Sequence, residues 1–213
     1  MIASSPSDFR SKVREHRLEP VALKPEVLDL ARAAVAEAGL LVVGEPHGVS
    51  ETASVLYSLA GALDTRAVAF EWSHEEMDAP LQGFLRGGSF DFDRLDREPA
   101  PEYWQLRDRE MAERLMEQWD EDTPLLVLVG AVHAQLSTEE GETMATHLAR
   151  RRPRLQPAMI DYGAGLCWSR GEMHDVAGPT PPAPIIFEVR NATPAPVPRR
   201  PNCTGAEGAL TAS

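Results

Sequence analysis

The sequence predicts an α/β fold: a single three-layer domain with a mostly parallel central sheet, a short lid insertion and a Pro-rich C-terminal tail. Apolar runs alternate with helical patterns from residue 25 to residue 162, as in chains whose parallel strands are joined by crossover helices. Two of these runs are continuously apolar, which is typical of strands buried on both faces. At 213 residues and 43% hydrophobic content, the chain is long enough to bury one core.

The first predicted unit is a helix, a strand and a second helix. The helix over residues 25–39 has proline in its first turn and stops at glycine. The residues expected on its inward face are Val27, Leu28, Leu30, Ala31, Ala34 and Val35. An apolar strand follows over residues 40–44, and a helical pattern resumes over residues 50–63.

The middle of the chain continues the alternation. A short strand is predicted over residues 66–71 and a helix over residues 74–85. Residues 86–101 are rich in glycine, proline and charge, which is typical of an exposed loop or lid. A helix over residues 102–119 is expected to pack its aromatic and aliphatic side and to leave its charged face in solvent.

The last part of the domain contains two more strands. They are predicted over residues 125–130 and 156–162, with a helix between them over residues 138–151. Ser137 or Thr138, together with the acidic residues that follow, is expected to cap that helix.

We therefore expect three parts: an N-terminal arm at 1–24, an α/β domain at 25–178 and a Pro-rich tail at 179–213. Within the tail, only residues 185–190 are expected to form a strand, at a sheet edge, because prolines surround them.

Composition narrows the classes of function. The net charge of −12 argues against a nucleic-acid partner, because the only basic stretch, at residues 150–154, is expected to cap a helix C-terminus. Cys167 and Cys203 indicate neither a disulfide framework nor a cysteine-based zinc site. The chain has no secretory signal and no apolar segment of the roughly 20 residues needed to span a bilayer, so we expect a cytoplasmic protein without a membrane partner.

Two Gly-x-x-His turns follow directly on apolar strands and end at His47 and His133. A third strand ends on Glu71, and Glu45 lies inside the first turn. Buried parallel strands deliver the residues that follow them to the carboxyl edge of the sheet, where α/β folds place their ligand crevices. We therefore expect these four residues to share one site, although a lone strand-end histidine is more often structural.

A neutral imidazole at such an edge has two chemical uses. It can accept a proton from water, or it can bind a divalent metal, and a nearby carboxylate orients it in both cases. The predicted catalytic residues are His47, Glu45, Glu71 and His133, and the predicted metal ligands are His47, His133 and Glu71. Zinc, manganese or cobalt would suit these donors, with one position left open for water. Glu45 could instead cap the helix that follows it.

Further residues are candidates for binding substrate. His74 follows Glu71 by three positions, but its acidic neighbours are equally typical of a solvated helix start. Tyr103 and Trp104 open the long helix after the predicted lid, where they could line a cleft or, for Trp104, simply pack on the sheet. Residues 161 and 162 end the fourth strand, and we interpret them as a terminus exposed to water rather than as part of the crevice.

Three segments resemble a known clan. GEPHGVSE at 44–51, AFEW at 69–72 and LVGAVHAQ at 128–135 are similar to the signature segments of the erythromycin esterase/ChaN-like/TIKI-TraB clan. The resemblance spans roughly residues 40 to 136. By position, Glu45, His47, Glu71 and His133 match the motif residues. The chain is short, its insertion after the second motif is small and its first motif has one residue fewer than the esterase form, so it is closer to ChaN and TIKI members.

The resemblance implies a hydrolase and leaves its chemistry open. Esterases of the clan are proposed to activate water with histidine alone, TIKI-type peptidases use a divalent metal and ChaN-like proteins are associated with haem. We therefore expect an enzyme that hydrolyses an ester or amide of a small molecule or peptide, with or without a divalent metal. The alternatives are a haem- or cofactor-binding protein with a tyrosine or histidine ligand, and a peptide-tailoring or partner-binding protein whose Pro-rich tail is recognised.

Overall fold

The computed structural model describes residues 20–71, 101–139, 141–169, 172–176 and 181–190, together with residues 192 and 194. Its centre is a five-stranded sheet in the order β2-β3-β1-β4-β7, and every neighbouring pair in it is parallel. The strands are β1 (Leu40–Glu45), β2 (Ala67–Phe70), β3 (Leu125–Gly130), β4 (Ala158–Asp161) and β7 (Ile185–Glu188). The predicted α/β class with a mostly parallel central sheet is confirmed.

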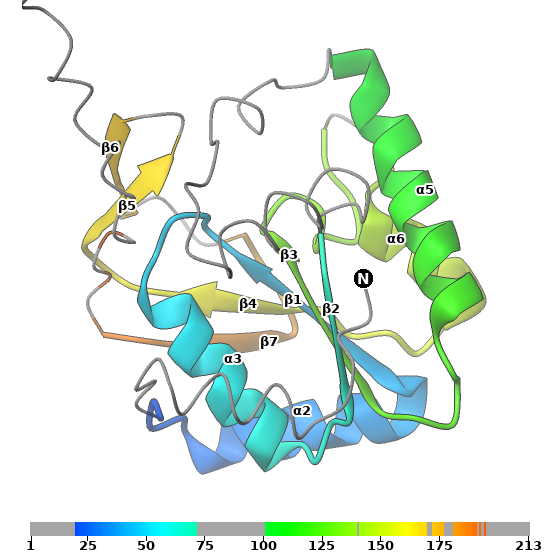
Figure 1. The fold of residues 1–213 in the computed structure, drawn as a ribbon, viewed down its shortest axis with the longest axis horizontal. Coiled ribbons are helices and arrows are strands. Elements are labelled where there is room, and N and C mark those ends of the chain that lie inside the picture. Colours follow the sequence, from blue (N-terminus) through cyan, green and yellow to red (C-terminus); the bar gives the residue numbers. More distant parts are fainter. Residues whose placement is uncertain are drawn as a thin grey trace, which may run out of the picture.

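Helices cover both faces of this sheet (Figure 1). Buried residues of α2 (Pro25–Ala38), except Ala38 at its end, and of α3 (Glu51–Ala62) pack in one core cluster with one side of the strands. Buried residues of α5 (Pro101–Gln118) and α6 (Met144–Arg151) pack in a second cluster with the other side. The structure is therefore layered helix, sheet, helix.

The helices that follow the two central strands, β1 and β3, lie on opposite faces of the sheet. After β1 the chain enters α3 on one face, and after β3 it reaches α6 on the other face. These strands are neighbours, with Glu45 paired in register with Gly130 at their carboxyl ends. In open α/β sheets the crevice forms where adjacent strands diverge to opposite faces, so the loops after β1 and β3 flank such a position.

Strand β1 is buried along its whole length, since all six of its residues are shielded from solvent. Leu40, Leu41, Leu125 and Leu126 are completely shielded from solvent. Each such side chain contributes about 1.5–3 kcal/mol relative to an exposed one. One expected core residue is wrong: Leu30 is 52% exposed, because it lies at the edge of the helical face whose centre is Ala31, Ala34 and Val35.

Helix α6 begins later than the sequence pattern predicts. It starts at Met144, and its N-cap is Thr143, whose hydroxyl and backbone form a reciprocal capping box with Thr146. The expected caps at Ser137 or Thr138 are wrong, because Thr138 pairs with Gly141 across a tight turn before the helix. Thr138 therefore lies in a turn that precedes the helix rather than at its N-terminus.

The fifth strand of the sheet comes from the region predicted to be the tail. β7 is an edge strand beside β4, as expected, and its Ile185 and Phe187 are fully buried. Packing of the core thus continues past residue 178, where we expected the domain to end. A hairpin of β5 (Leu166–Ser169) and β6 (Glu172–Asp175), which the sequence did not indicate, stands beside the sheet (Figure 1).

Several expectations concern residues outside the described ranges. These are the helix over residues 74–85, residues 86–100 of the lid predicted at 86–101, and Cys203. The last residue of the predicted lid, Pro101, is the first residue of α5. Cys167 is described, and it is a buried free thiol. Within the described part of the chain, no helix is both long enough and apolar enough to cross a membrane.

Candidate functional site

The Glu71 carboxylate is the centre of the candidate site. It follows the last residue of β2 and accepts a hydrogen bond of 2.7 Å from the backbone N–H of Gly130 at the end of β3. Its other oxygen accepts a hydrogen bond of 2.8 Å from Arg107 on α5. The Nε2 atom of His133 lies 3.3 Å from one carboxylate oxygen, and that of His47 lies 3.4 Å from the other. Glu71 therefore joins the two imidazoles.

His47 is held by its own turn. Its Nδ1 atom donates to Glu45 over 2.7 Å, since a carboxylate can only accept. The turn after β1 passes through Gly48, whose φ of +77° is the left-handed conformation that glycine adopts most readily. Beyond it, the Ser50 hydroxyl donates to the carbonyl oxygen of Pro194 over 3.0 Å. The other ring nitrogen of His47, Nε2, faces Glu71.

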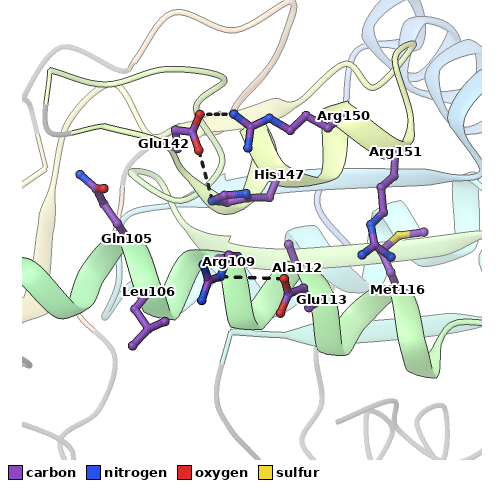
Figure 2. A pocket seen from close by; sticks show the side chains of 10 residues that line it. All are labelled: Gln105, Leu106, Arg109, Ala112, Glu113, Met116, Glu142, His147, Arg150 and Arg151. Carbon is purple, nitrogen blue, oxygen red and sulfur yellow. Dashed lines mark hydrogen bonds and ion pairs between the residues drawn. The ribbon is translucent and has the colours of Figure 1, made fainter.

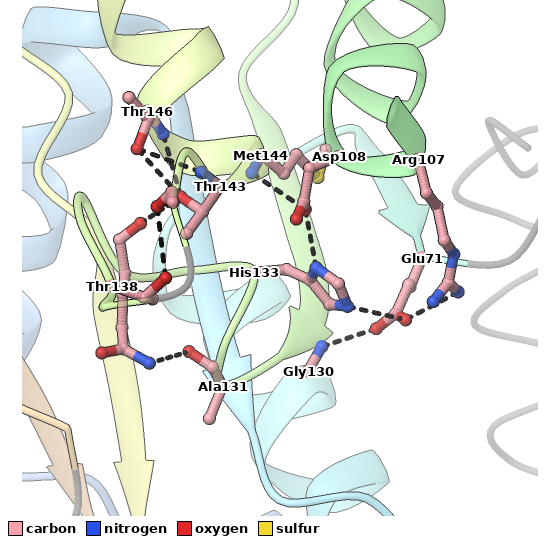
Figure 3. A network of polar contacts seen from close by, with 12 residues as sticks. Glu71, Arg107, Asp108, Gly130, Ala131, His133, Thr138, Thr143, Met144 and Thr146 are labelled. Carbon is pink, nitrogen blue, oxygen red and sulfur yellow. Dashed lines mark hydrogen bonds and ion pairs between the residues drawn. The ribbon is translucent and has the colours of Figure 1, made fainter. Parts of the chain in front are cut away.

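His133 is arranged in the same way on the other side of Glu71 (Figure 3). Its Nδ1 atom donates to Asp108 on α5 over 2.6 Å. Asp108 also accepts a hydrogen bond of 2.9 Å from the backbone N–H of Met144, the first residue of α6. Each imidazole thus has a carboxylate at Nδ1 and the shared carboxylate of Glu71 beside Nε2. The side chain of His47 is 49% exposed and that of His133 only 11% exposed.

The glycines of the two Gly-x-x-His turns serve close packing. A Cβ on Gly130 would lie 2.7 Å from Nε2 of His47 and 3.2 Å from the Glu71 carboxylate. A Cβ on Gly44 would lie 2.5 Å from the sulfur of Met159 and 2.8 Å from Cβ of Ala134. The two glycines thus let the site side chains and the two turns approach each other.

The carboxylates shift the titration of the site. Burial would raise the pKa of Glu71, but its interactions with His133 and His47 outweigh this and hold that pKa far below its usual range. The hydrogen bond with Glu45, followed by the interaction with Glu71, raises the pKa of His47 to about 10. Burial lowers the pKa of His133, but Asp108 and Glu71 overcome this effect and raise it to about 9. Both imidazoles are therefore protonated at neutral pH.

All four residues predicted to be catalytic meet in this network: Glu45, His47, Glu71 and His133. Of the residues predicted to bind substrate, His74 lies outside the described residues. Tyr103 and Trp104 belong to the first turn of α5, but their side chains are also outside the described part. Their predicted roles remain predictions.

Sequence reasoning missed Arg107 and Asp108. The charged face of α5 was expected to be solvated, yet Asp108 is only 4% exposed. A signal was present, because Asp108 lies in helical register with the buried residues Ala112, Leu115 and Trp119. An acidic residue on the apolar side of a helix needs a buried partner, and here that partner is His133.

Tyr162 was interpreted as part of an exposed strand terminus, which is wrong. It is 3% exposed, and its hydroxyl contacts the hydroxyl of Thr52 at 2.6 Å. Thr52 in turn donates to Glu45 over 3.0 Å. Asp161 behaves differently, because its carboxylate accepts from the backbone N–H of Gly163 over 2.8 Å in the turn after β4.

A hollow of about 490 Å³ is lined by residues of α5 and α6 and by Glu142 (Figure 2). Its lining includes exposed charged side chains, among them Arg150 and Glu142, which form an ion pair, and Arg109 and Glu113, whose charged atoms lie 3.9 Å apart. None of Glu45, His47, Glu71 and His133 lines it. The candidate site is therefore separate from this hollow, and it reaches solvent through the half-exposed side chain of His47.

We expect the contacts of Asp108 with His133 and with the start of α6 to stabilise the fold. Replacing Asp108 with alanine is expected to lower the free energy of unfolding by about 3–5 kcal/mol, because it leaves a buried imidazolium and a helix N-terminus without their partner. Replacing Asp108 with asparagine, which retains an acceptor, should cost less. Urea unfolding measures both. A change within about 0.5 kcal/mol for the alanine variant, typical of a solvated surface residue, would contradict the buried contact.

The donors of this site include side chains that commonly bind divalent metals. Two imidazoles and a carboxylate are common zinc ligands. However, the Glu71 carboxylate lies between the two imidazoles and presents a different oxygen to each. Among the described residues, no three or more histidine, cysteine, aspartate or glutamate side chains form a group that could hold a metal ion. The predicted zinc, manganese or cobalt remains a prediction.

Comparison of the chain with protein-family models, curated proteins and solved structures gives no match. The site therefore has to be interpreted from its own geometry.

Proposed function

We propose that the chain is a hydrolase of ester or amide bonds in which His47 activates water. The observation that carries this proposal is the pair of carboxylates on the two ring nitrogens of a half-exposed histidine: Glu45 at Nδ1 and Glu71 beside Nε2. A carboxylate at Nδ1 fixes the tautomer whose Nε2 can accept a proton, and it stabilises the imidazolium that results.

Exposure distinguishes the roles of the two histidines. The base must reach water and substrate, and the side chain of His47 is 49% exposed. The side chain of His133 is 11% exposed and is held between Asp108 and Glu71, so it acts by positioning Glu71. Arg107 donates a hydrogen bond to the Glu71 carboxylate, and 36% of its side chain is exposed. Its remaining N–H groups are suited to stabilising negative charge on the carbonyl oxygen of a substrate.

The balance of charge in the site favours protonated imidazoles. The carboxylates of Glu45, Glu71 and Asp108 carry three negative charges, and the guanidinium of Arg107 carries one positive charge. Two imidazolium ions therefore bring the formal charge of these described groups to zero. His47 must lose its proton before it can act as a base. Because its pKa is raised to about 10, we infer that the hydrolase works best in alkaline solution.

The function is tested with 4-nitrophenyl esters and 4-nitroanilides of increasing acyl length. We expect release of 4-nitrophenol or 4-nitroaniline above the buffer rate for at least one acyl group at pH 9, with turnover unchanged after dialysis against a chelator. Loss of turnover on chelation, restored by zinc or manganese, would overturn the metal-free mechanism. No turnover of any compound in the set would contradict the hydrolase.

A resemblance to the erythromycin esterase/ChaN-like/TIKI-TraB clan agrees with hydrolysis, and its esterase members are proposed to use histidine in this way. The haem-binding alternative has no support from Tyr162 or His133, because the hydroxyl of Tyr162 is buried against Thr52 and both nitrogens of His133 face carboxylates. A Soret band after haem addition would reverse this preference.

A further inference from the structure

A chain of buried hydroxyl groups leads from the interior of the protein to Glu45. The Tyr162 hydroxyl lies 2.6 Å from the hydroxyl of Thr52, and that hydroxyl lies 3.0 Å from one oxygen of Glu45. The other oxygen of Glu45 accepts from Nδ1 of His47. The three groups come from α3, from the end of β1 and from the residue after β4. The contacts therefore join three separate elements to the imidazole.

The direction of these hydrogen bonds follows from what each group can donate. An ionised carboxylate only accepts, so Thr52 donates its single proton to Glu45. The oxygen of Thr52 must then accept from Tyr162, which donates. Burial raises the pKa of Tyr162, and this effect outweighs the opposing one of Thr52, so the phenol keeps the proton it has to donate. The chain of donors is thus fixed in one direction.

Burial makes the chain rigid. Tyr162 is 3% exposed, and Thr52 and Glu45 are each 8% exposed, so water does not replace these contacts readily. Both oxygens of Glu45 are occupied, one by Thr52 and one by His47. A carboxylate held at both oxygens cannot rotate away from the imidazole without breaking a buried hydrogen bond.

We propose that Thr52 and Tyr162 are positioning residues that hold the Glu45 carboxylate on Nδ1 of His47, and thereby fix the orientation of the water-activating imidazole. The kinetic part of this inference rests on the proposed hydrolase. The structural part, that the hydroxyl chain fixes the Glu45–His47 hydrogen bond, does not.

The structural part is tested by NMR of the full chain labelled with ¹⁵N. The Nδ1 protons of His47 and His133 are both hydrogen-bonded to carboxylates and should give signals downfield of the amides. Thr52→Val keeps the shape but removes the hydroxyl, and should abolish or shift the His47 signal while retaining that of His133, which serves as the internal control for folding. Thr52→Ser should retain both signals. An unchanged His47 signal in Thr52→Val would overturn the proposal.

The kinetic part uses turnover of the best 4-nitrophenyl ester. Thr52→Val should lower kcat by about 10- to 100-fold with KM little changed, because a misplaced base affects reaction more than binding. Thr52→Ser should restore kcat, and Tyr162→Phe should have a smaller effect, because Thr52 can still donate to Glu45. Wild-type kcat in Thr52→Val, with His47→Ala inactive, would refute positioning but not the hydrolase. Full turnover by His47→Ala would instead refute the hydrolase.

Discussion

Replacement of His47 with alanine is expected to lower kcat for ester hydrolysis by about 10²–10⁴-fold, the usual contribution of a general base. The fold should remain intact, because the side chain is half exposed and makes its contacts at the edge of the sheet rather than in the core. Steady-state kinetics at pH 9 measure the effect, and thermal unfolding checks the fold.

His147→Ala is the matched control for this experiment. His147 is also an imidazole within reach of a carboxylate, since its Nε2 lies 3.9 Å from Glu142, but it belongs to α6 and lines the hollow away from the site. We expect wild-type turnover from this variant. If both histidine variants lose activity equally, or if neither does, His47 is not the base.

The second large effect is the dependence of kcat/KM on pH. The carboxylates of Glu45 and Glu71 raise the pKa of His47 to about 10, so the neutral base is about one part in 10³ at pH 7. The logarithm of kcat/KM should rise with a slope of one from pH 7 and level off near pH 10. A plateau that begins near pH 6.5, the ordinary pKa of histidine, would show that Glu45 and Glu71 do not raise the pKa of the base.

Stability should change with pH in the opposite direction. A histidine whose pKa is raised on folding contributes stability that is complete below about pH 6.5 and is lost as the pH rises through its folded value. For His133 and His47 these values are about 9 and 10. The range in which His47 becomes an active base is thus the range in which the fold loses part of its stabilisation. The depressed pKa of Glu71 acts at the other end, since its contribution is lost as the pH falls below about 4.5.

The two central strands could be predicted from the sequence because they are continuous apolar runs between helical patterns. The pattern of residues 40–44 and 125–130 predicted β1 and β3 to within one residue. Because both strands are parallel, the residues that follow them had to appear at one edge, and the structure places His47, Glu71 and His133 together there. Their catalytic role is a proposal and awaits experiment.

What the sequence did not reveal depends on contacts between distant elements. Asp108 and Thr52 sit on helices, where single polar residues resemble those of a solvated face or a helix start. Their partners, His133 and Glu45, are 25 and 7 residues away, and only the packing of α5 and α3 on the sheet brings them together. The start of α6 was missed because several polar residues before it could each cap a helix.

Whether Glu71 joins the two imidazoles can be measured by NMR titration of the histidine side chains in the wild type and in Glu71→Gln. We expect the pKa of His47 near 10 and that of His133 near 9 in the wild type, with both values lower in the variant. Ordinary values near 6.5 for both histidines in the wild type, unaffected by the substitution, would contradict the shared carboxylate and with it the proposed site.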